Sequence, residues 1–447
     1  MGQFRKVRSI AGTLTLAWLL AGPALAEPLT LAEAMGRGLT RSPEMGQAQA
    51  RVGAAEAVRD QVTRSWFPTV ELDAAAGLRH LENAARNNLG LSALDEKPLY
   101  ATIGVNQPVF DFGRRSNQAR VQQARLASAG RDEQAAGEAA AYNIAQAYLQ
   151  VLVQQRIVQT SQNNLLFHNA LAADVGEGVE QGAMSISERQ QARERVQGAR
   201  ISADQASADL ATAKSELALL VGVPDVEVTT PPGADAELPV TLDAALAEAA
   251  RSDPRLLSSS DRFDAAKWAA KRARAEYLPT VGLQGKASGG KDFDGYRGST
   301  RDYQMLLAMR WNLFDGGVTA ARVREADRNA DEARFALSQA QRDSELQVRK
   351  AWIALQSWRS RIENQQARLG EADGVRETYR AQFGIGRRSL LDLLDAQGAV
   401  YNASVETEVA RGGTLLAQYG VLAHLSRLRS VFKIAPTKVD PAQYGPR

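Results

Sequence analysis

The chain is built from two copies of one unit, and this duplication constrains its fold more than any other feature. Residues recur 211 positions later in the first part of the unit (31 to 242) and 204 positions later in the rest (110 to 314). The recurring residues are Leu31/Leu242, Ala34/Ala245, Pro43/Pro254, Pro68/Pro279, Thr69/Thr280, Val70/Val281, Phe110/Phe314, Asp111/Asp315, Gly113/Gly317, Gly182/Gly386, Ser185/Ser389 and Ala192/Ala396. This period is far longer than that of a solenoid repeat, so the sequence predicts two pseudo-symmetric structural repeats.

The two spacings divide the chain into five segments. They are a signal peptide at 1–26, a first repeat at 27–222, a linker at 223–241, a second repeat at 242–428 and a C-terminal tail at 429–447. The drop of seven positions between the spacings, 211 minus 204, falls between Val70 and Phe110. We therefore expect one loop in that stretch to be shorter in the second repeat. The Pro-rich linker, VPDVEVTTPPGADAELPV, favours a non-helical connector.

The first 26 residues have the three parts of a secretory signal peptide. A basic start at 5–8 precedes an apolar stretch at 10–21 and the small-residue site Ala24-Leu25-Ala26, so we expect cleavage after Ala26. Removal of the three basic residues lowers the formal charge from +3 to 0, which leaves no argument for nucleic-acid binding. Because the chain contains no cysteine, we expect no disulfide framework and no lipid-anchored N-terminal cysteine.

Two proline-free stretches predict long helices. No proline occurs between Pro108 and Pro224 or between Pro279 and Pro436, and helix-forming residues are abundant in both. Apolar residues recur every seven positions, as in a left-handed coiled coil. They are Ile144, Val151, Val158 and Leu165, and Val348, Leu355, Ile362 and Leu369. A helix over 318–383 would be about 100 Å long, which exceeds what a globular domain needs.

Four runs of alternating apolar and polar residues predict β-strands. They lie at about 70–78, 99–109, 280–288 and 303–313, joined in pairs by polar loops at about 80–98 and 288–301. Each is about 9–11 residues long, the length of a tilted membrane-spanning strand. Six aromatic residues near the strand ends fit the girdles of such a sheet. They are Trp66, Phe67, Tyr100, Tyr277, Tyr303 and Trp311. A half-buried sheet in a soluble domain is the alternative interpretation.

Four strands cannot close a membrane barrel, since such barrels begin at about eight strands. The exposed edges of the predicted sheet therefore require other copies of the chain. Three copies would give twelve strands and a helical ring with pseudo-six-fold symmetry. Two copies would give eight strands, an alternative whose interior would be filled by side chains.

The order of these elements resembles that of TolC-type outer-membrane efflux proteins. The strand-to-helix junctions read QPVFDFG at 107–113 and WNLFDGG at 311–317, and the second helical turn reads FGIGRRSLLDLLDAQGAVYNA at 383–403. The junction residues that carry the likeness are Phe110, Asp111, Gly113, Phe314, Asp315 and Gly317. The likeness covers about 29–430, in both repeats.

The resemblance implies an α+β membrane protein. Three chains would form a 12-stranded β-barrel in the outer membrane, continued by a long α-helical coiled-coil tunnel across the periplasm of a Gram-negative bacterium. The linker and the tail would form an equatorial belt. A periplasmic adaptor and an inner-membrane pump, either an ABC transporter or a proton-driven one, would dock at the lower end. No enzymatic activity and no cofactor are expected.

Each repeat has the same helix-to-helix turn. Gly is followed three residues later by Ser, and an acidic residue follows three further on. These residues are Gly182, Ser185 and Glu188 in the first repeat and Gly386, Ser389 and Asp392 in the second. One interpretation is structural, because Gly ends one helix, Ser caps the next, and the acid completes a capping box. Asp395 follows one turn later on a similar face of the helix.

The resemblance gives these turns a second interpretation. Acidic residues at the positions of Asp392 and Asp395 ring the closed periplasmic entrance of TolC-type proteins. Six carboxylates in a narrow pore would repel one another, so we expect their pKa values to rise and cations to be attracted. By position, Arg388 and Glu188 would link neighbouring helices, whereas Phe383 replaces a Tyr and offers no hydroxyl. Adaptor docking would break the contacts and swing the inner hairpins outward.

Several functions remain open at this point. Type I protein secretion is the preferred interpretation, because many relatives dedicated to proton-driven drug pumps are lipoproteins and this chain has no cysteine. Small-molecule efflux is the second, and a periplasmic coiled-coil adaptor or scaffold is a distant third. No catalytic or phosphate-binding motif appears. His80, His168 and His424 are far apart and lack the spacing of metal ligands.

Overall fold

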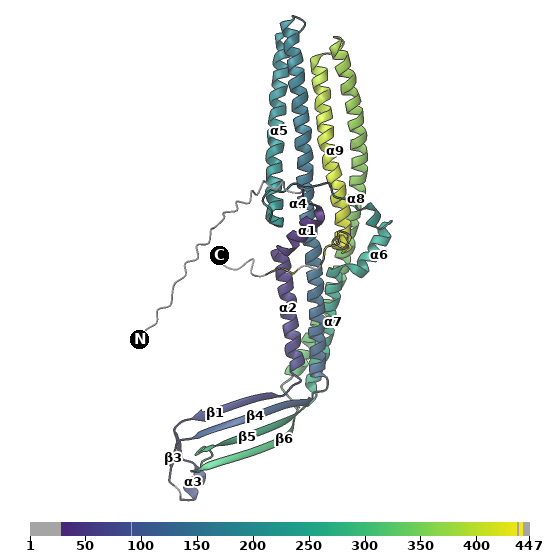
Figure 1. Ribbon diagram of the computed structural model, residues 1–447. Helices are drawn as coiled ribbons and strands as arrows, with labels where there is room; N and C mark the ends of the chain where they lie inside the picture. Colours follow the sequence, from purple (N-terminus) through teal and green to yellow (C-terminus); the bar gives the residue numbers. More distant parts are fainter. Residues whose placement is uncertain (1–27, 91, 436–437, 441–447) are drawn as a thin grey trace, which may run out of the picture.

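The computed structural model describes residues 28–90, 92–435 and 438–440. The expected signal peptide and its cleavage after Ala26 lie outside these residues. The molecule is elongated: a four-stranded sheet forms one end, and two helical hairpins extend to the other end (Figure 1). Shorter helices surround the long ones at mid-height, where the two ends of the described chain also lie.

The two repeats contain the same series of elements. The first has α1 (Leu31–Thr40), α2 (Pro43–Arg64), β1 (Thr69–Ala76), β4 (Leu99–Phe110), α4 (Arg114–Glu180) and α5 (Ile186–Val221). The second has α6 (Leu242–Ser252), α7 (Pro254–Arg274), β5 (Thr280–Lys291), β6 (Ser299–Arg310), α8 (Val318–Gly384) and α9 (Leu390–His424), followed by α10 (Leu428–Val431). Helices α4 and α8 have 67 residues each and begin and end 204 positions apart, as the duplication predicts.

The loops of the sheet differ from the prediction. The first loop, expected only as a polar segment at about 80–98, contains β2 (Arg79–Leu81), α3 (Ala84–Asn88) and β3 (Leu94–Glu96), with β2 paired to β3. The second loop covers only 292–298 rather than 288–301, since the glycine-rich end of β5 pairs with β6 up to Lys291. Strand β6 begins and ends three to four residues earlier than its alternating run. Trp311 and Leu313 continue the alternation after the chain has left the sheet.

The antiparallel sheet has the order β1-β4-β5-β6, and its register gives it one apolar and one polar face. Val70 is opposite Val105, which is opposite Gly285, which is opposite Met305. The apolar face therefore runs across all four strands and ends in Tyr303, Met305 and Leu307, which are 72–76% exposed. The opposite face carries Glu71, Asp73, Thr102, Asn106, Gln284, Lys286, Gln304 and Asp302. Within the described chain, β1 and β6 each have one unpaired edge.

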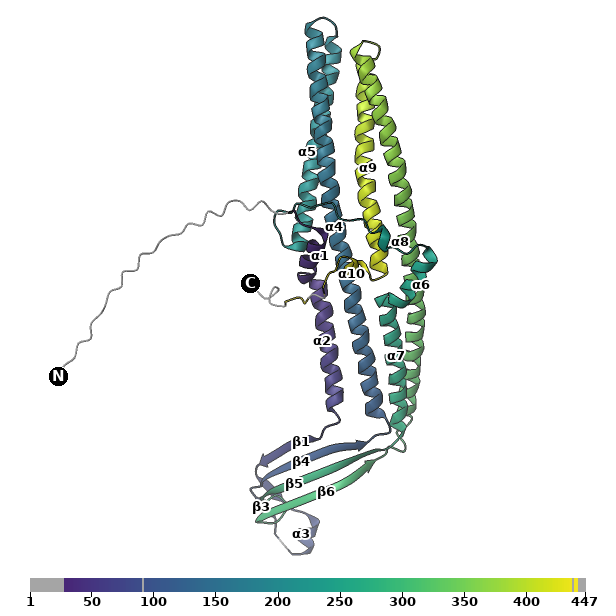
Figure 2. The same cartoon turned by 45° about the vertical axis from the view of Figure 1, so that its right-hand side comes forward.

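Helices α4 and α8 run the whole length of the helical part, while their neighbours change halfway. Helix α9 packs between them in the upper half and α7 in the lower half, so the end of α9 meets the start of α7 (Figure 2). In the same way α5 and α2 follow one another along α4. Gly412 allows the close approach of α9 to α4, because a Cβ there would lie 2.3 Å from Cγ2 of Val153.

The linker is held against the helices at mid-height. Apart from the 3-10 turn η1 (Asp235–Glu237) it is irregular, and Leu29 forms a parallel bridge with Val228. The hydroxyl of buried Tyr148 donates to the Leu29 and Thr229 carbonyls, at 2.7 and 2.8 Å. The hydroxyl of Tyr419 donates to the Pro232 carbonyl at 2.8 Å. The largest apolar core surrounds these contacts, so the linker is fixed at the level where the helices exchange neighbours.

The strand-to-helix junctions are built alike in both repeats. Gly113 and Gly317 precede α4 and α8 with φ values of 87° and 88°, a left-handed conformation that favours glycine. The carboxylate of Asp111 accepts the Arg115 amide at 3.1 Å, and that of Asp315 accepts the Thr319 amide at 2.8 Å. Each aspartate thus satisfies an amide that the first helical turn leaves unpaired.

Candidate gate at the helical tips

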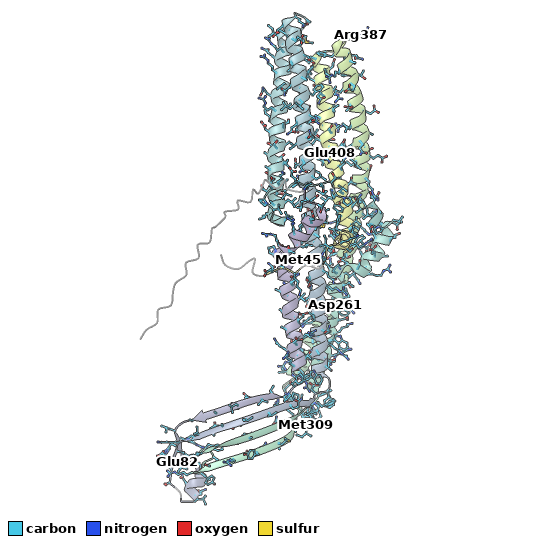
Figure 3. All side chains as sticks on the ribbon, viewed as in Figure 1. Met45, Glu82, Asp261, Met309, Arg387 and Glu408 are labelled. Atoms are coloured by element: carbon cyan, nitrogen blue, oxygen red, sulfur yellow. The ribbon has the colours of Figure 1, made fainter. Side chains whose placement is uncertain are left out.

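The α4–α5 and α8–α9 turns lie together at the end of the molecule farthest from the sheet, where Figure 3 labels Arg387. Gly182 and Gly386 both have a φ of 74°, so each allows the chain to reverse after its long helix. The amide of Arg387 donates to the Gln382 carbonyl at 2.8 Å, and that of Ala183 donates to the Gly178 carbonyl at the same distance. The two turns therefore have nearly the same backbone conformation.

Complete capping boxes follow both turns. The Glu188 carboxylate accepts the Ser185 amide at 2.7 Å and the Ser185 hydroxyl at 2.8 Å. The Asp392 carboxylate accepts the Ser389 hydroxyl at 2.9 Å. Hydrogen bonds from Ser185 hold the pKa of Glu188 below its usual value, and hydrogen bonds from Ser389 do the same for the pKa of Asp392. In the single chain both pKa values are lowered because the cap donors favour the charged form, and the rise expected for six carboxylates in an assembled ring stays a prediction.

The charged contact that joins the hairpins was not predicted. Arg195 of α5 forms an ion pair with Asp395 of α9 at 3.4 Å, with side chains 44% and 64% exposed. Of the expected polar gate residues, only Asp395 forms an ion pair or hydrogen bond with the other hairpin in the described chain. Patterns along one helix carry no signal for such a pair, because the partners are 200 residues apart.

Arg388 and Glu188 make their contacts within their own hairpins, and the expected links between neighbouring helices of the closed entrance stay a prediction. The Arg388 side chain donates to Gln382 at 3.0 Å, lies 4.2 Å from the centre of the Tyr379 ring and is 3.7 Å from Asp392. All three partners of Arg388 belong to the α8–α9 hairpin. The Glu188 carboxylate accepts hydrogen bonds from Ser185, in the α4–α5 hairpin. Within the described chain, the hydrogen bonds and ion pair of Arg388 and Glu188 therefore lie within their own hairpins.

Apolar side chains pack the hairpins together just behind the turns. The tip cluster consists of Leu171, Val175, Ala192, Leu390, Leu393 and Leu394. Phe383 packs against this cluster, so it contributes apolar surface where a Tyr would present a hydroxyl. Burial of such side chains favours the packing of the two hairpins against each other, by about 25 cal/mol for each Å² of apolar surface removed from water.

A row of buried polar contacts, here called the hairpin clasp, joins α4 to α9 below the tip cluster. Ser161 and Tyr401 are linked through their hydroxyls at 3.0 Å, and the Gln397 amide donates to the Asn164 side-chain carbonyl at 2.8 Å. His168 follows one turn later at 6% exposure, and burial lowers its pKa. Sequence analysis did not single out Asn164 or Gln397, because isolated amides in a helical pattern resemble surface residues.

No group of three or more His, Asp or Glu residues is placed to hold a metal ion within 28–90, 92–435 and 438–440. His80, in the first sheet loop, instead pairs with Asp95 at 2.6 Å, and this contact raises the pKa of the imidazole. Within the same residues, no helix has the length and apolarity to cross a membrane.

The chain belongs to the outer membrane efflux protein family, whose model matches residues 35–223 and 245–424, one stretch in each repeat. Membership places the protein in the outer membrane, extending into the periplasm, in a family made up of channel proteins.

Three comparisons illustrate this relationship. The outer membrane efflux protein BepC of Brucella suis is 27% identical over 346 residues, which are 73% of this chain and 72% of BepC. The alkaline protease secretion protein AprF of Pseudomonas aeruginosa is 30% identical over 191 residues, which are 42% of this chain and 37% of AprF. The Campylobacter jejuni CmeC outer membrane channel shares the fold, with a TM-score of 0.77, 16% identity, and coverage of 93% of this chain and 88% of CmeC.

Proposed function

We propose that three copies of this chain form the exit duct of an export machine that spans the outer membrane and the periplasm. The observation that carries the proposal is the sheet, whose continuous apolar face suits lipid and whose polar face suits a wet lumen. The unpaired edges of β1 and β6 require strands from other chains in lipid, where every backbone donor needs a partner. Twelve strands from three copies would close a barrel, and the helices would continue it as a tunnel.

The helical tips would form the gate of this duct. Asp392 and Asp395 would contribute six carboxylates from three chains at the narrow end, which attract cations and repel one another. The Arg195–Asp395 pair, the tip cluster and the hairpin clasp hold the two hairpins of each chain together. An adaptor that opens the duct must separate these contacts and let the α8–α9 hairpin swing outward.

Ion currents through the purified protein in planar bilayers test the gate. Replacement of both acids, Asp392→Ala with Asp395→Ala, should reduce the cation selectivity and increase the conductance, because the ring charge and the Arg195 pair are both lost. Asp209→Ala on α5 is the matched control, since it removes a carboxylate that lies outside the proposed ring and accepts from Gln205 of its own helix. Unchanged conductance and selectivity in the double variant would show that the acids do not line the narrow part of the duct.

Type I protein secretion is the export process that we propose for this duct. It is supported by AprF, which is 30% identical to this chain over the matched residues, against 27% for BepC, and whose name describes alkaline protease secretion. Small-molecule efflux is the second candidate, supported by BepC, which matches more of the chain and whose name describes efflux. In either process, a periplasmic adaptor and an inner-membrane ABC transporter or proton-driven pump would supply the energy, because the duct is passive.

A deletion strain distinguishes the two processes. Its secreted proteins and its susceptibility to drugs and dyes are compared with those of the parent and of a complemented strain. Loss of a protein from the medium with unchanged susceptibility supports protein secretion. Increased susceptibility with an unchanged set of secreted proteins would contradict it and support efflux.

A further inference from the structure

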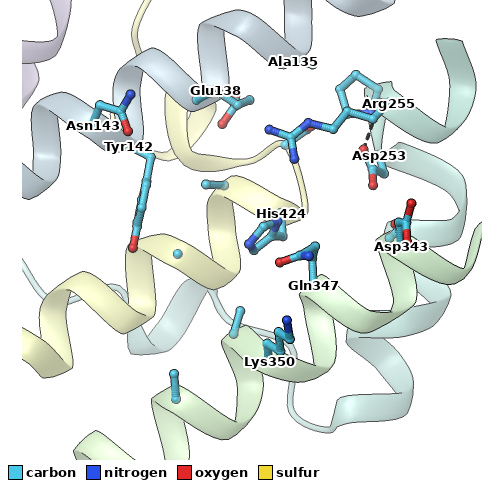
Figure 4. Close-up of a pocket in the computed structure, with 18 of the residues that line it drawn as sticks. Ala135, Glu138, Tyr142, Asn143, Asp253, Arg255, Asp343, Gln347, Lys350 and His424 are labelled. Carbon is cyan, nitrogen blue, oxygen red and sulfur yellow. Dashed lines mark hydrogen bonds between the residues drawn. The ribbon is translucent and has the colours of Figure 1, made fainter. Parts of the chain in front are cut away.

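A cavity of about 590 Å³, here called the charged cavity, lies at mid-height where α9 ends and α7 begins, between α4 and α8 (Figure 4). The four helices belong to the same chain, so one chain is enough to form the cavity. Its size is within the range of about 300–1,000 Å³ that is usual for sites of small molecules. Alanines of α4, α8 and α9 supply much of the lining, together with the ring of Tyr142. Most of the wall is therefore apolar, and a few polar groups can fix the orientation of a ligand.

A buried carboxyl group lies in the wall that α4 contributes. Glu138 is 8% exposed, and its Oε2 atom has no hydrogen-bond partner among the described residues. Burial raises the pKa of this carboxyl to about 7, opposed by the backbone amide and charge of Arg429 and by the Leu428 amide. Because a buried acceptor without a partner is unfavourable, Oε2 is a position at which a donor group of a ligand would be stabilised.

Two cationic side chains of the lining also lack a counter-charge in contact. Arg255, in the first turn of α7, and Lys350 of α8 are exposed and form no ion pair or side-chain hydrogen bond within the described residues. The acidic groups of the lining are already engaged. The Asp253 carboxylate accepts the Arg255 amide at 2.9 Å, and the Asp343 carboxylate accepts the Gln339 side chain at 2.8 Å. Arg255 and Lys350 therefore remain available to groups of a ligand.

The positions of these three groups indicate which ligand chemistry fits. In Figure 4 the Arg255 side chain extends towards Glu138, and His424 lies between Arg255 and Lys350. Burial lowers the pKa of His424 and the charge of Arg255 lowers it further, so the imidazole adds no third cation. An amide suits the Glu138 end, because its N–H donates to a carboxylate while its carbonyl accepts from a guanidinium. A carboxylate suits the Lys350 end, where the ammonium acts as a point charge.

We propose that the charged cavity binds a small organic acid that carries an amide group, such as an N-acylated amino acid. The amide N–H donates to Oε2 of Glu138, and the amide carbonyl accepts from Arg255. The carboxylate pairs with Lys350, and the acyl group packs against the alanines. Binding needs neither the exit duct nor its gate, so this inference goes beyond the proposed function.

Isothermal titration calorimetry of the detergent-purified protein tests the site with hippurate, N-benzoylglycine, which has all three features. Two analogues each lack one of them. Hippuramide replaces the carboxylate by a neutral carboxamide, and benzoyloxyacetate replaces the amide N–H by an ester oxygen. All titrations are done above the pKa of Glu138, where its carboxylate is charged.

The test variants are Lys350→Gln and Arg255→Gln, which change exposed side chains and leave the apolar core intact. Arg349→Gln is the matched control, since Arg349 pairs with Glu345 of its own helix at 2.7 Å and does not line the cavity. Circular dichroism of each variant verifies that it is folded.

The wild-type protein and Arg349→Gln should bind hippurate equally well, and Lys350→Gln should bind it about fivefold more weakly. The same substitution should leave the weaker binding of hippuramide unchanged, because the analogue already lacks the group that Lys350 contacts. Benzoyloxyacetate should bind the wild-type protein about tenfold more weakly than hippurate, since Oε2 of Glu138 loses its donor. Arg255→Gln should weaken all three ligands, because each keeps the carbonyl that Arg255 contacts.

Two results would overturn the proposal. One is the absence of hippurate binding by the folded wild-type protein, which would make the cavity a solvated void only. The other is an equal loss of hippurate and hippuramide binding in Lys350→Gln. Neither result changes the ion currents expected in planar bilayers, so the proposed duct stands or falls separately.

Discussion

Removal of one partner from the hairpin clasp should weaken the closed gate. Asn164 and Gln397 are 8% and 5% exposed, and their 2.8 Å hydrogen bond joins the two hairpins of one chain. The change Gln397→Leu leaves the Asn164 carbonyl buried without its donor, which costs about 1–3 kcal/mol. Because about 1.4 kcal/mol corresponds to a factor of ten, the ratio of open to closed hairpins should rise about 5- to 150-fold in each chain.

The double change Asn164→Leu with Gln397→Leu provides the essential comparison. Replacement of both partners by apolar side chains leaves no buried amide unpaired, so the closed state should recover most of the lost stability. Gln365→Leu is a second control, because Gln365 donates to Glu406 at 2.7 Å within a single hairpin. Planar-bilayer conductance should therefore be highest for Gln397→Leu and close to wild type for the other two. Equal conductance in the single and double leucine variants would refute this account of the clasp.

Two further predictions concern stability. Burial raises the pKa of Glu138 to about 7, partly offset by Arg429, so the contribution of this group to folding is greatest below its unfolded pKa of 4.5. This contribution to the free energy of unfolding should decline by about 3 kcal/mol as the pH rises to 7, and Glu138→Gln should remove that decline. If the free energy of unfolding of the variant keeps the pH dependence of the wild type, the raised pKa of Glu138 is contradicted. Gly182→Ala should destabilise the protein by about 1–2 kcal/mol because of the positive φ, whereas Gly198→Ala, within α5, should stabilise it by about 0.5–1 kcal/mol. Thermal unfolding measures both glycine variants, and equal shifts in the same direction would argue against backbone strain at the turn.

Much of the fold could be predicted because the duplication supplies each element twice. Helices α4 and α8 begin and end at residues that are 204 positions apart, as the duplication predicts. Both stretches lack proline and have a seven-residue apolar pattern, which favours long helices. The strand ends could not be predicted as well. Gly289 and Gly290 of β5 pair through their backbones and show no side-chain alternation. Trp311 prolongs the alternating pattern although its indole donates to the Tyr277 carbonyl outside the sheet.

The site was predicted less completely than the fold. The capping residues of both turns follow local rules, so Ser185 and Ser389 could be read from the sequence. Contacts between hairpins depend on how two distant segments pack, and neither the Arg195–Asp395 pair nor the Asn164–Gln397 bond has a local signature. The capping bonds also explain why the pKa of Asp392 is lowered rather than raised in the single chain. Whether six carboxylates reverse this shift in the assembly stays a prediction.

Single-channel recording of the purified wild-type protein in a planar bilayer tests the central claim most directly. If three copies form a water-filled duct that the helical tips close, the protein should insert and give discrete, cation-selective steps of low conductance. The Gln397→Leu protein should give larger steps under the same conditions. A wild-type protein that inserts into the bilayer but conducts no ions, with or without the substitution, would contradict the account.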